Sequence, residues 1–375
     1  MATELVNPAS PDITYIRVAS PTGPVTRTVL RTPLRDALPS EIPVIDISPI
    51  FSPHLEDREA VARQVNHAAT NIGFFYIKNH GVETAVIQDT YNAALEFYRQ
   101  DLDQKLKATV AQSSRYNGYR APDTMRLNPD EGLDLREAFS ITYDPRLDPN
   151  VTHVQDIPAI AKEHLTMEDH HFTATQNVPN FKSATTTYFR SCLALARALT
   201  RTFALSLGLP ETTFDSKIAY PDVALNMNYY PPIRDGGSVE PGDPDAGVSI
   251  GSHTDFQLFT ILWQDMVGGL QVLNRNGQWI NAKPMPDTFV VNIADCLQRI
   301  TNDKYVSTIH RAQNWSGKER VSFAFFWGFG LHETCEVLKN CIEAGEKKKY
   351  EDIQCWEWLR KRVDDMTQLD KEKEA

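Results

Sequence analysis

The sequence lacks the cysteine pattern of a disulfide-stabilised or thiolate-zinc protein. Its five cysteines are odd in number and scattered, and no two of them form a Cys-x-x-Cys pair. Small secreted domains and structural zinc sites are usually built from closely spaced cysteines. The pattern therefore argues against both frameworks and favours a reducing compartment, so we expect a cytoplasmic protein.

Long apolar runs and long basic runs are also missing. No stretch approaches the roughly 20 apolar residues that span a bilayer, and no basic flank followed by an apolar run opens the chain. Lys and Arg number 38 against 49 Asp and Glu, which gives a net charge of −11. We therefore expect neither a membrane nor a nucleic-acid backbone as a partner.

The pattern of the 375 residues changes from helical to β along the chain. Helical spacing of apolar residues predicts helices over 56–72, 84–110 and 181–207. After about residue 220, short strands recur at a spacing that predicts a sandwich or barrel rather than a parallel sheet. We divide the chain into an extended N-terminal arm (1–41), a largely helical region (42–212), a β core (213–335) and a C-terminal helix with a charged tail (336–375).

The stretch 248–262 is rich in β-branched and aromatic residues and predicts a strand. Side chains alternate along a strand, so His253 and Asp255 would point to one side and Thr254 to the other. An imidazole and a carboxylate on one face can hold two adjacent positions of a divalent metal. Taken alone, such a pair is more often a hydrogen-bonded pair at the surface.

Candidate partners for this pair lie further along the chain. His310 ends a predicted strand over 305–310, and Arg320 and Ser322 would share a face of the next strand. A guanidinium at the start of an apolar strand is costly to bury without an anion, and it can bind both oxygens of a carboxylate. A structural salt bridge is the alternative explanation for Arg320.

The order of these motifs resembles a known enzyme family. The chain carries, in sequence, Asn228-Tyr229-Tyr230-Pro231, His253-Thr254-Asp255, His310 and Arg320-Val321-Ser322. This order is similar to that of the iron(II)- and 2-oxoglutarate-dependent dioxygenases, in the branch that contains isopenicillin N synthase. The segment 73–82, with Gly-Phe-Phe and Asn-His-Gly, is similar to the N-terminal signature of that branch.

The resemblance implies a fold, a metal site and a co-substrate site. The fold would be mainly β with flanking helices, around a double-stranded β-helix (jelly-roll) core. His253, Asp255 and His310 would bind Fe(II), and O2 and 2-oxoglutarate would react there with ascorbate as a supporting reductant. The residues expected at the distal carboxylate of 2-oxoglutarate are Arg320, Ser322, Tyr230 and Asn228.

The resemblance also implies a reaction class. We expect a monomeric oxygenase that hydroxylates, desaturates or cyclises a small molecule in natural-product biosynthesis, with Asn226, Phe326 and Ser140 bordering the substrate. One alternative is an iron oxidase that does not use 2-oxoglutarate, like isopenicillin N synthase or aminocyclopropane-carboxylate oxidase. The other is a non-catalytic small-molecule binding protein on the same scaffold.

Overall fold

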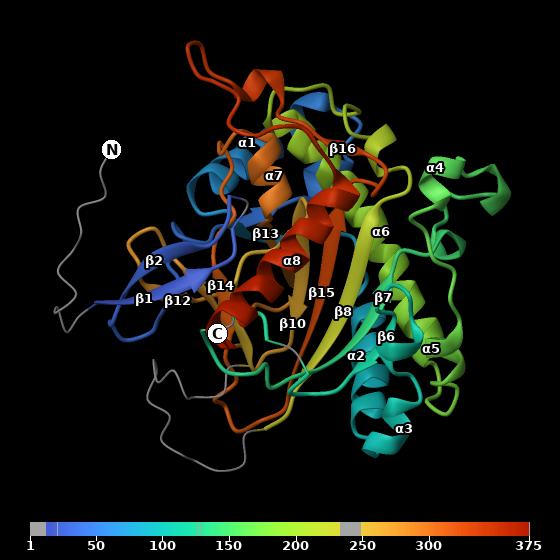
Figure 1. Cartoon of the computed structure of the whole chain (residues 1–375). Helices are drawn as coiled ribbons and strands as arrows, with labels where there is room; N and C mark the ends of the chain where they lie inside the picture. The colour runs from blue at the N-terminus through green and yellow to red at the C-terminus, as the bar shows by residue number, and fades with distance from the viewer. Residues whose placement is uncertain (1–12, 21, 125, 129, 233–248, 375) are drawn as a thin grey trace.

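The computed structural model describes residues 13–20, 22–124, 126–128, 130–232 and 249–374. The start of the predicted arm (1–12), the first residue of the predicted strand 248–262, and the last residue of the charged tail lie outside the described residues. Two β-sheets form the centre of the molecule, and helices cover one of them (Figure 1).

The larger sheet has eight strands. Their order is β4 (Val44–Asp46), β5 (Phe74–Lys78), β13 (Thr288–Ile293), β10 (Phe259–Gln264), β15 (Arg320–Gly328), β8 (Asp222–Tyr230), β7 (Glu137–Thr142) and β6 (Gly118–Arg120). Only the pair β4–β5 is parallel in this sheet, as far as the described residues show. Figure 1 shows β10, β15, β8, β7 and β6 as neighbouring ribbons across the molecule.

The smaller sheet lies opposite and has five strands. Their order is β3 (Arg35–Asp36), β12 (Trp279–Asn281), β11 (Leu270–Leu273), β14 (His310–Ala312) and β9 (Ile250–His253). A cluster of buried apolar residues that includes Phe74, Val272 and Val290 joins the two sheets at one end. This cluster fixes the spacing of the sheets, so the polar side chains described below can face each other.

The outer face of the larger sheet is apolar because side chains alternate along its strands. Phe325 and Trp327 of β15 are fully buried there. Phe189 of helix α6 (Phe181–Ser206) packs edge-on against Phe325, and the indole nitrogen of Trp327 donates a 2.9 Å hydrogen bond to Thr200. The alternate residues of the same strand therefore face the second sheet, which decides where a site can form.

Two of the three predicted helices have close to the expected ends. These are α1 (Leu55–Asn71) and α6, whereas the single helix predicted over 84–110 is wrong. Helix α2 (Thr84–Tyr98) ends early, and a separate short helix, α3 (Leu102–Leu106), follows it. The break is stabilised by Lys105, whose buried ammonium donates to the carbonyl of Tyr98 and to Glu137. A continuous helix would leave this ammonium group without these two partners.

The remaining strands and α-helices complete the fold. They are the hairpin β1 (Ile13–Val18) and β2 (Val25–Leu30), α4 (Ala159–Lys162), α5 (His170–Thr173), α7 (Asp295–Ile300), β16 (Thr334–Cys335), β17 (Ile353–Gln354) and α8 (Cys355–Glu374). The range 1–41, expected to be an extended arm, thus contains an antiparallel hairpin in its described part. The C-terminal helix expected within 336–375 is α8, which begins at Cys355.

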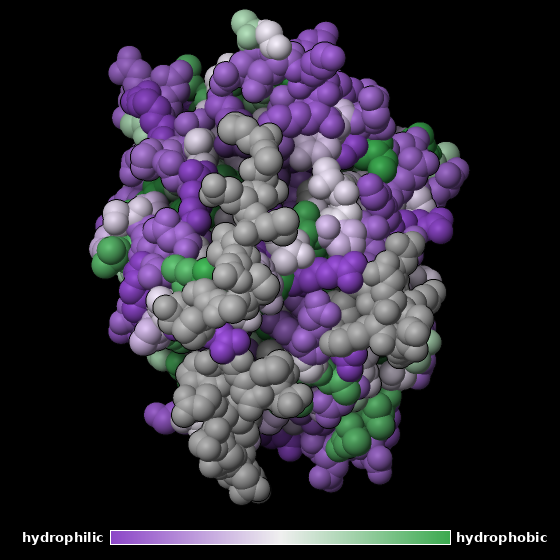
Figure 2. Space-filling view, turned by 60° about the vertical axis from the view of Figure 1, so that its left-hand side comes forward, coloured by the Kyte–Doolittle hydropathy of each residue, from purple (hydrophilic) through white to green (hydrophobic). Residues whose placement is uncertain are grey.

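The cysteines are buried, and the visible surface in Figure 2 is mostly hydrophilic. All five cysteines are buried and free, as the absence of a disulfide pattern predicted. Where coloured atoms are visible, Figure 2 shows a largely hydrophilic face with small, separate apolar areas. In the described part of the chain, no helix combines the length and the apolar character that a membrane crossing requires.

The packing of α6 on the larger sheet generates a stability prediction. Leu193 is fully buried in the main core cluster, so Leu193→Ala should lower the free energy of unfolding by about 2–5 kcal/mol through lost burial and a cavity. Urea denaturation followed by circular dichroism measures this change. Thr187→Ala, at an exposed position of the same helix, is the matched control, and equal effects in both variants would contradict the packing described.

Candidate functional site

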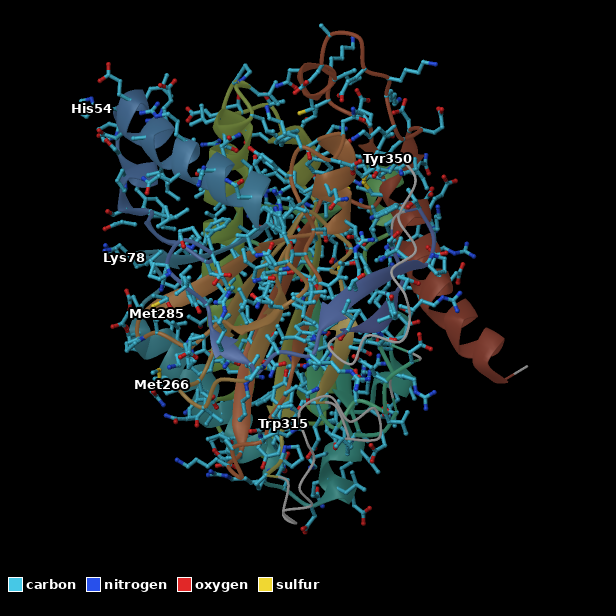
Figure 3. The ribbon with its side chains drawn as sticks, turned by 90° about the vertical axis from the view of Figure 1, so that its left-hand side faces the viewer. His54, Lys78, Met266, Met285, Trp315 and Tyr350 are labelled. Carbon is cyan, nitrogen blue, oxygen red and sulfur yellow. The ribbon has the colours of Figure 1, made fainter. Side chains whose placement is uncertain are left out.

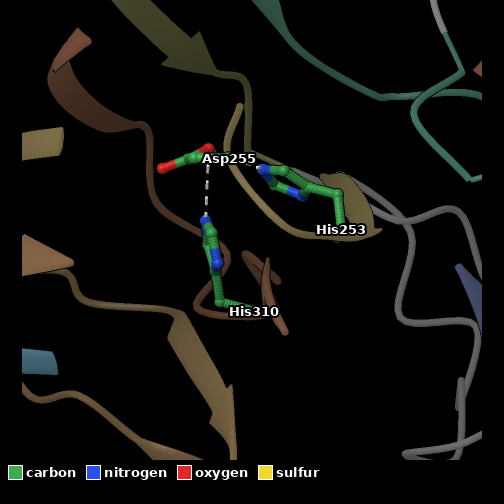
Figure 4. Close-up of side chains that lie close together, drawn as sticks. All are labelled: His253, Asp255 and His310. Carbon is green, nitrogen blue, oxygen red and sulfur yellow. Dashed lines mark ion pairs between the residues drawn. The ribbon is translucent and has the colours of Figure 1, made fainter. Parts of the chain in front are cut away.

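Two histidines lie side by side on neighbouring strands of the smaller sheet. His253, the last residue of β9, is paired in register with His310, the first residue of β14. Directly paired residues point to the same face, and the two ring centroids are 4.4 Å apart. The structure therefore brings together two of the three predicted metal ligands (Figure 4).

The strand predicted over 305–310 is wrong, because β14 begins only at His310. The preceding residues bind the C-terminal end of α1 instead. The amide of Val306 donates a 3.0 Å hydrogen bond to the carbonyl of Ala69, and the hydroxyl of Thr308 donates to the carbonyl of Ile72. Carbonyls at a helix end lack partners within the helix, and this segment supplies them.

Asp255 lies beyond the end of β9, in the connection to β10, so the prediction of a strand through this residue is also wrong. Its carboxylate nevertheless points at both histidines. Its Oδ1 atom is 3.6 Å from Nε2 of His253 and 3.7 Å from Nε2 of His310. Its Oδ2 atom accepts 2.6 Å hydrogen bonds from the hydroxyl of Thr260 and the amide of Asn292. One oxygen is thus held by the protein and the other faces the imidazoles.

The backbone sets the tautomer of both histidines. Nδ1 of His253 lies 2.7 Å from the carbonyl of Gly251, and Nδ1 of His310 lies 3.0 Å from the carbonyl of Thr308. A carbonyl can only accept, so each Nδ1 carries the proton and each Nε2 keeps its lone pair. With Asp255, the ligand atoms lie within 4.8 Å of one another, and two imidazoles with one carboxylate are a donor set that suits iron(II).

The charge states of Asp255 and His310 match metal binding. For His253, burial acts to lower the pKa, but the hydrogen bond and the charge of Asp255 outweigh it and raise that pKa. Burial, together with the neighbouring His253, lowers the pKa of His310 to about 4. Burial acts to raise the pKa of Asp255, but His310 and His253 outweigh it and hold that pKa below its usual value. At neutral pH the carboxylate is therefore charged and His310 is neutral, which are the forms that coordinate a metal.

Arg320 is the main feature of the opposite wall. It begins β15, is 1% exposed, and donates one 3.2 Å hydrogen bond from Nη2 to Gln264. Its Nε and Nη1 atoms have no hydrogen-bond partner among the described residues. The ring of Tyr230 lies 4.5 Å from the guanidinium, and its hydroxyl is 3.2 Å from that of Ser322. Such a buried cation with free donors is costly unless an anion binds there.

The remaining predicted residues lie on the same face of the larger sheet. Asn228 is paired with Ser322 and accepts a hydrogen bond from Arg136. The hydroxyl of Ser140 donates a 2.8 Å hydrogen bond to the side-chain carbonyl of Asn226. Phe326 is half-buried and shares the inward face of β15 by alternation. All of the predicted site residues thus lie on or beside the inner walls.

Sequence analysis missed Thr260, Asn292 and Arg136. Thr260 and Asn292 are polar residues with an apolar residue on each side in their strands, and that interruption is the signal that could have identified them. Arg136 carries no comparable local signal. Its contact with Asn228 joins residues 92 positions apart in the sequence, and only the pairing of β7 with β8 brings these positions together.

A cavity elsewhere on the surface is not part of this site. It has a volume of about 670 Å³ and its lining includes Tyr91, Trp263, Met266 and Met285. Figure 3 places Met266 and Met285 at the periphery of the fold. None of the predicted metal or co-substrate residues, all of which the structure describes, lines this cavity, so it offers no competing position for the chemistry.

Two family models match the chain. Residues 42–163 match the model described as the N-terminal region of non-haem dioxygenases in morphine synthesis. Residues 221–328 match the model of the 2-oxoglutarate–Fe(II) oxygenase superfamily. The second match includes His253, Asp255, His310, Arg320 and Ser322.

Similar proteins are found in fungi. The chain is 59% identical over 370 residues to the 2-oxoglutarate–Fe(II) type oxidoreductase ppzC of Metarhizium majus, covering 98% of this chain and 99% of that protein. It is 58% identical to ppzC of Metarhizium rileyi over the same shares. The crystal structure of a full-length Neurospora crassa protein in complex with alpha-KG has a TM-score of 0.70 at 27% identity, covering 86% of this chain and 96% of that one. These likenesses confirm the predicted double-stranded β-helix core.

The hydrogen bonds to Asp255 generate a prediction about metal affinity. Asn292→Ala and Thr260→Val should each weaken divalent iron binding about 10–100-fold, because outer partners orient a ligating carboxylate. Anaerobic titration with Fe(II) measures the dissociation constant. Thr288→Val, on the same strand as Asn292 but bonded to the carbonyl of Met285, is the control. Unchanged affinity in both site variants would contradict this role.

Proposed function

Because this chain belongs to the 2-oxoglutarate–Fe(II) oxygenase superfamily, we propose that it oxidises a small molecule with Fe(II) as cofactor and 2-oxoglutarate and O2 as co-substrates. The two ppzC relatives carry 2-oxoglutarate and Fe(II) in their names, which does not favour an oxidase without 2-oxoglutarate. Their names as oxidoreductases also argue against a non-catalytic binding protein.

The observation that carries this proposal is that Nε and Nη1 of buried Arg320 donate to no described residue. A carboxylate accepts strong hydrogen bonds from a guanidinium and also neutralises its buried charge, which a water molecule cannot do. The hydroxyls of Ser322 and Tyr230 lie next to each other beside this arginine and would complete the hydrogen bonds. We assign the distal carboxylate of 2-oxoglutarate to this position, with Asn228 supporting that end of the site.

His253, Asp255 and His310 would hold the iron. Two Nε2 lone pairs and a single carboxylate oxygen supply three ligands on one side, since Thr260 and Asn292 occupy the other oxygen of Asp255. Three positions then stay open for the co-substrates. Iron(II) with 2-oxoglutarate and O2 supplies the oxidant for a C–H bond, and ascorbate would support the reduced metal.

The protein's own tasks are orientation and exclusion of water. The backbone carbonyls behind both histidines fix the imidazoles, so the metal position does not depend on mobile side chains. Asn226, Ser140 and Phe326 line the inner face beside the co-substrate position and would border the substrate. Phe326 would help to keep water from the reacting bond.

Several more specific expectations belong to the same proposal. We expect hydroxylation, desaturation or ring closure in natural-product biosynthesis, by a cytoplasmic monomer of the isopenicillin N synthase-like branch. The division into 42–212 and 213–335 assigns the metal and co-substrate residues to the second region. The first region would supply Ser140 and the helices that support the larger sheet.

The metal assignment gives a direct prediction. His253→Ala, Asp255→Ala and His310→Ala should each abolish or strongly weaken Fe(II) binding, because each removes one of three ligands. Anaerobic titration monitored by calorimetry reports the affinity. His67→Ala, an exposed histidine on α1, is the control. If two of the three site variants bound iron as the wild type does, the assignment would be refuted.

The co-substrate assignment gives another prediction. Arg320→Ala should weaken 2-oxoglutarate binding roughly thirtyfold or more, since removing one partner of a buried charge pair costs about 2–5 kcal/mol. Arg320→Lys should recover only part of the affinity, because an ammonium cannot make the two-pronged contact. Isothermal titration of the Fe(II)-loaded protein measures both values. Arg63→Ala, an exposed arginine on α1, is the control.

Succinate production separates the two enzyme hypotheses. The wild type should release succinate from 2-oxoglutarate in proportion to product, and Arg320→Ala should lose this release while it still binds iron. Product that formed without succinate at saturating 2-oxoglutarate would support the oxidase alternative instead. In that case Arg320 would hold a carboxylate of the substrate itself.

A further inference from the structure

Two more arginines lie near the edge of the larger sheet formed by β6 and β7. Arg120 of β6 is paired with Ala138, Ala138 with Asn228, and Asn228 with Ser322. Directly paired residues share a face, so Arg120 is on the inner face with Ser322. Three interstrand steps of about 4.8 Å separate them, which gives about 14 Å between their Cα atoms.

Arg120 has an unusual environment for a half-buried cation. Within the described part of the chain, no hydrogen bond or ion pair is formed by its guanidinium, and its ring contact is with Tyr116 at 5.6 Å. Burial lowers its pKa, and the charge of Arg136 adds to that effect. A structural arginine at a sheet edge would be expected to have a carboxylate or carbonyl partner.

Arg136, which immediately precedes β7, is held on two sides. One of its Nη atoms donates to the side-chain carbonyl of Asn228, and its Nε is 3.7 Å from Oδ2 of Asp134. Asp134 is 1% exposed and accepts a 3.2 Å hydrogen bond from the amide of Gly251. Gly251 lies two residues before His253 on β9. The arginine is therefore fixed between the strand of the metal ligands and the inner face of β8.

Charge favours one class of ligand here. Arg120 and Arg136 are two cations with one carboxylate, Asp134, near them, and the carboxylate of Glu131 at Gly251 is hydrogen-bonded to the amide and hydroxyl of Ser252. Oδ2 of Asp134 makes no hydrogen bond to any described residue, so Asp134 offsets charge without blocking the donors of Arg136 through a close contact. The planar guanidinium suits a carboxylate.

We propose that Arg120 and Arg136 bind a carboxylate of the substrate, so that this enzyme acts on a small carboxylic acid. The proposal rests on the proposed function, because it takes the oxidised C–H bond to lie between this arginine pair and the histidines. Asp134 is a positioning residue that orients Arg136. Arg320 is a separate anion site, three strands away from Arg120 and with two donors of its own that no described residue occupies.

The test compares acids with their uncharged amides. The full-length protein, loaded with Fe(II) and 2-oxoglutarate, is given a panel of the proteinogenic amino acids and simple aliphatic and aromatic carboxylic acids, each beside its primary amide. Succinate release above the substrate-free level is measured. At least one acid should stimulate release, and its amide should need a tenfold or higher concentration for half-saturation.

Substitutions then locate the carboxylate. Arg120→Gln should raise the half-saturating concentration of the stimulating acid at least tenfold and reduce the preference for acid over amide. Arg120→Lys should restore part of that preference. Asp134→Asn, which keeps the shape but removes the charge, should change the concentration dependence more than the maximal rate. The exposed Arg63→Gln should behave as the wild type does.

The outcomes separate the two proposals. A wild type that releases no succinate with any compound, or without one, defeats the proposed function itself. If substrate-free release is present but no acid stimulates it, the carboxylate assignment is overturned. The same holds if acids and amides act equally, or if Arg120→Gln shifts neither. Stimulation by phosphate esters and not by acids would assign the arginines to a different anion.

Discussion

The cross-strand pairing of His253 with His310 is the constraint on which the candidate site depends. Each histidine is at the end of a short strand, and the register of β9 with β14 places them opposite each other. A slip of one residue would turn one imidazole to the other face of the sheet. Val306 and Thr308 donate hydrogen bonds to the C-terminal end of α1 and so fix the segment that leads into β14. These contacts help to fix the register of β14 from outside the sheet.

The larger sheet supplies the opposite wall because its two faces differ. Its outer face is apolar and packs on α6, which orients β15 and β8 through contacts such as Trp327 with Thr200. Its inner face then carries polar residues that are paired across strands, including Ser322 with Asn228. The strands cannot rotate without exposing the aromatic residues behind them. The positions of Arg320 and its neighbours are therefore determined by the hydrophobic core as much as by their own hydrogen bonds.

The residues that we propose for the metal and the co-substrate could be selected from the sequence, because each lies within a short motif and the motifs occur in a characteristic order. Local strand geometry was less predictable. Asp255 lies outside any strand, and the segment before His310 binds a helix end instead of a sheet. Propensity rules describe the chain locally, whereas these contacts join segments more than 200 residues apart. The same limit explains why Arg136 was missed, since its contact with Asn228 depends on which strands become neighbours.

The buried arginines show how structural and functional roles can be distinguished. Arg362 of α8 is fully buried, yet it pairs with Asp295 at 2.7 Å and donates to the carbonyls of Ala19 and Ser20, so its charge is used within the protein. Arg320 is equally buried but has two donors without a partner among the described residues. Natural proteins keep such local conflicts mainly where a ligand resolves them. The unsatisfied arginine on the inner face is therefore the position where we expect an anion to bind.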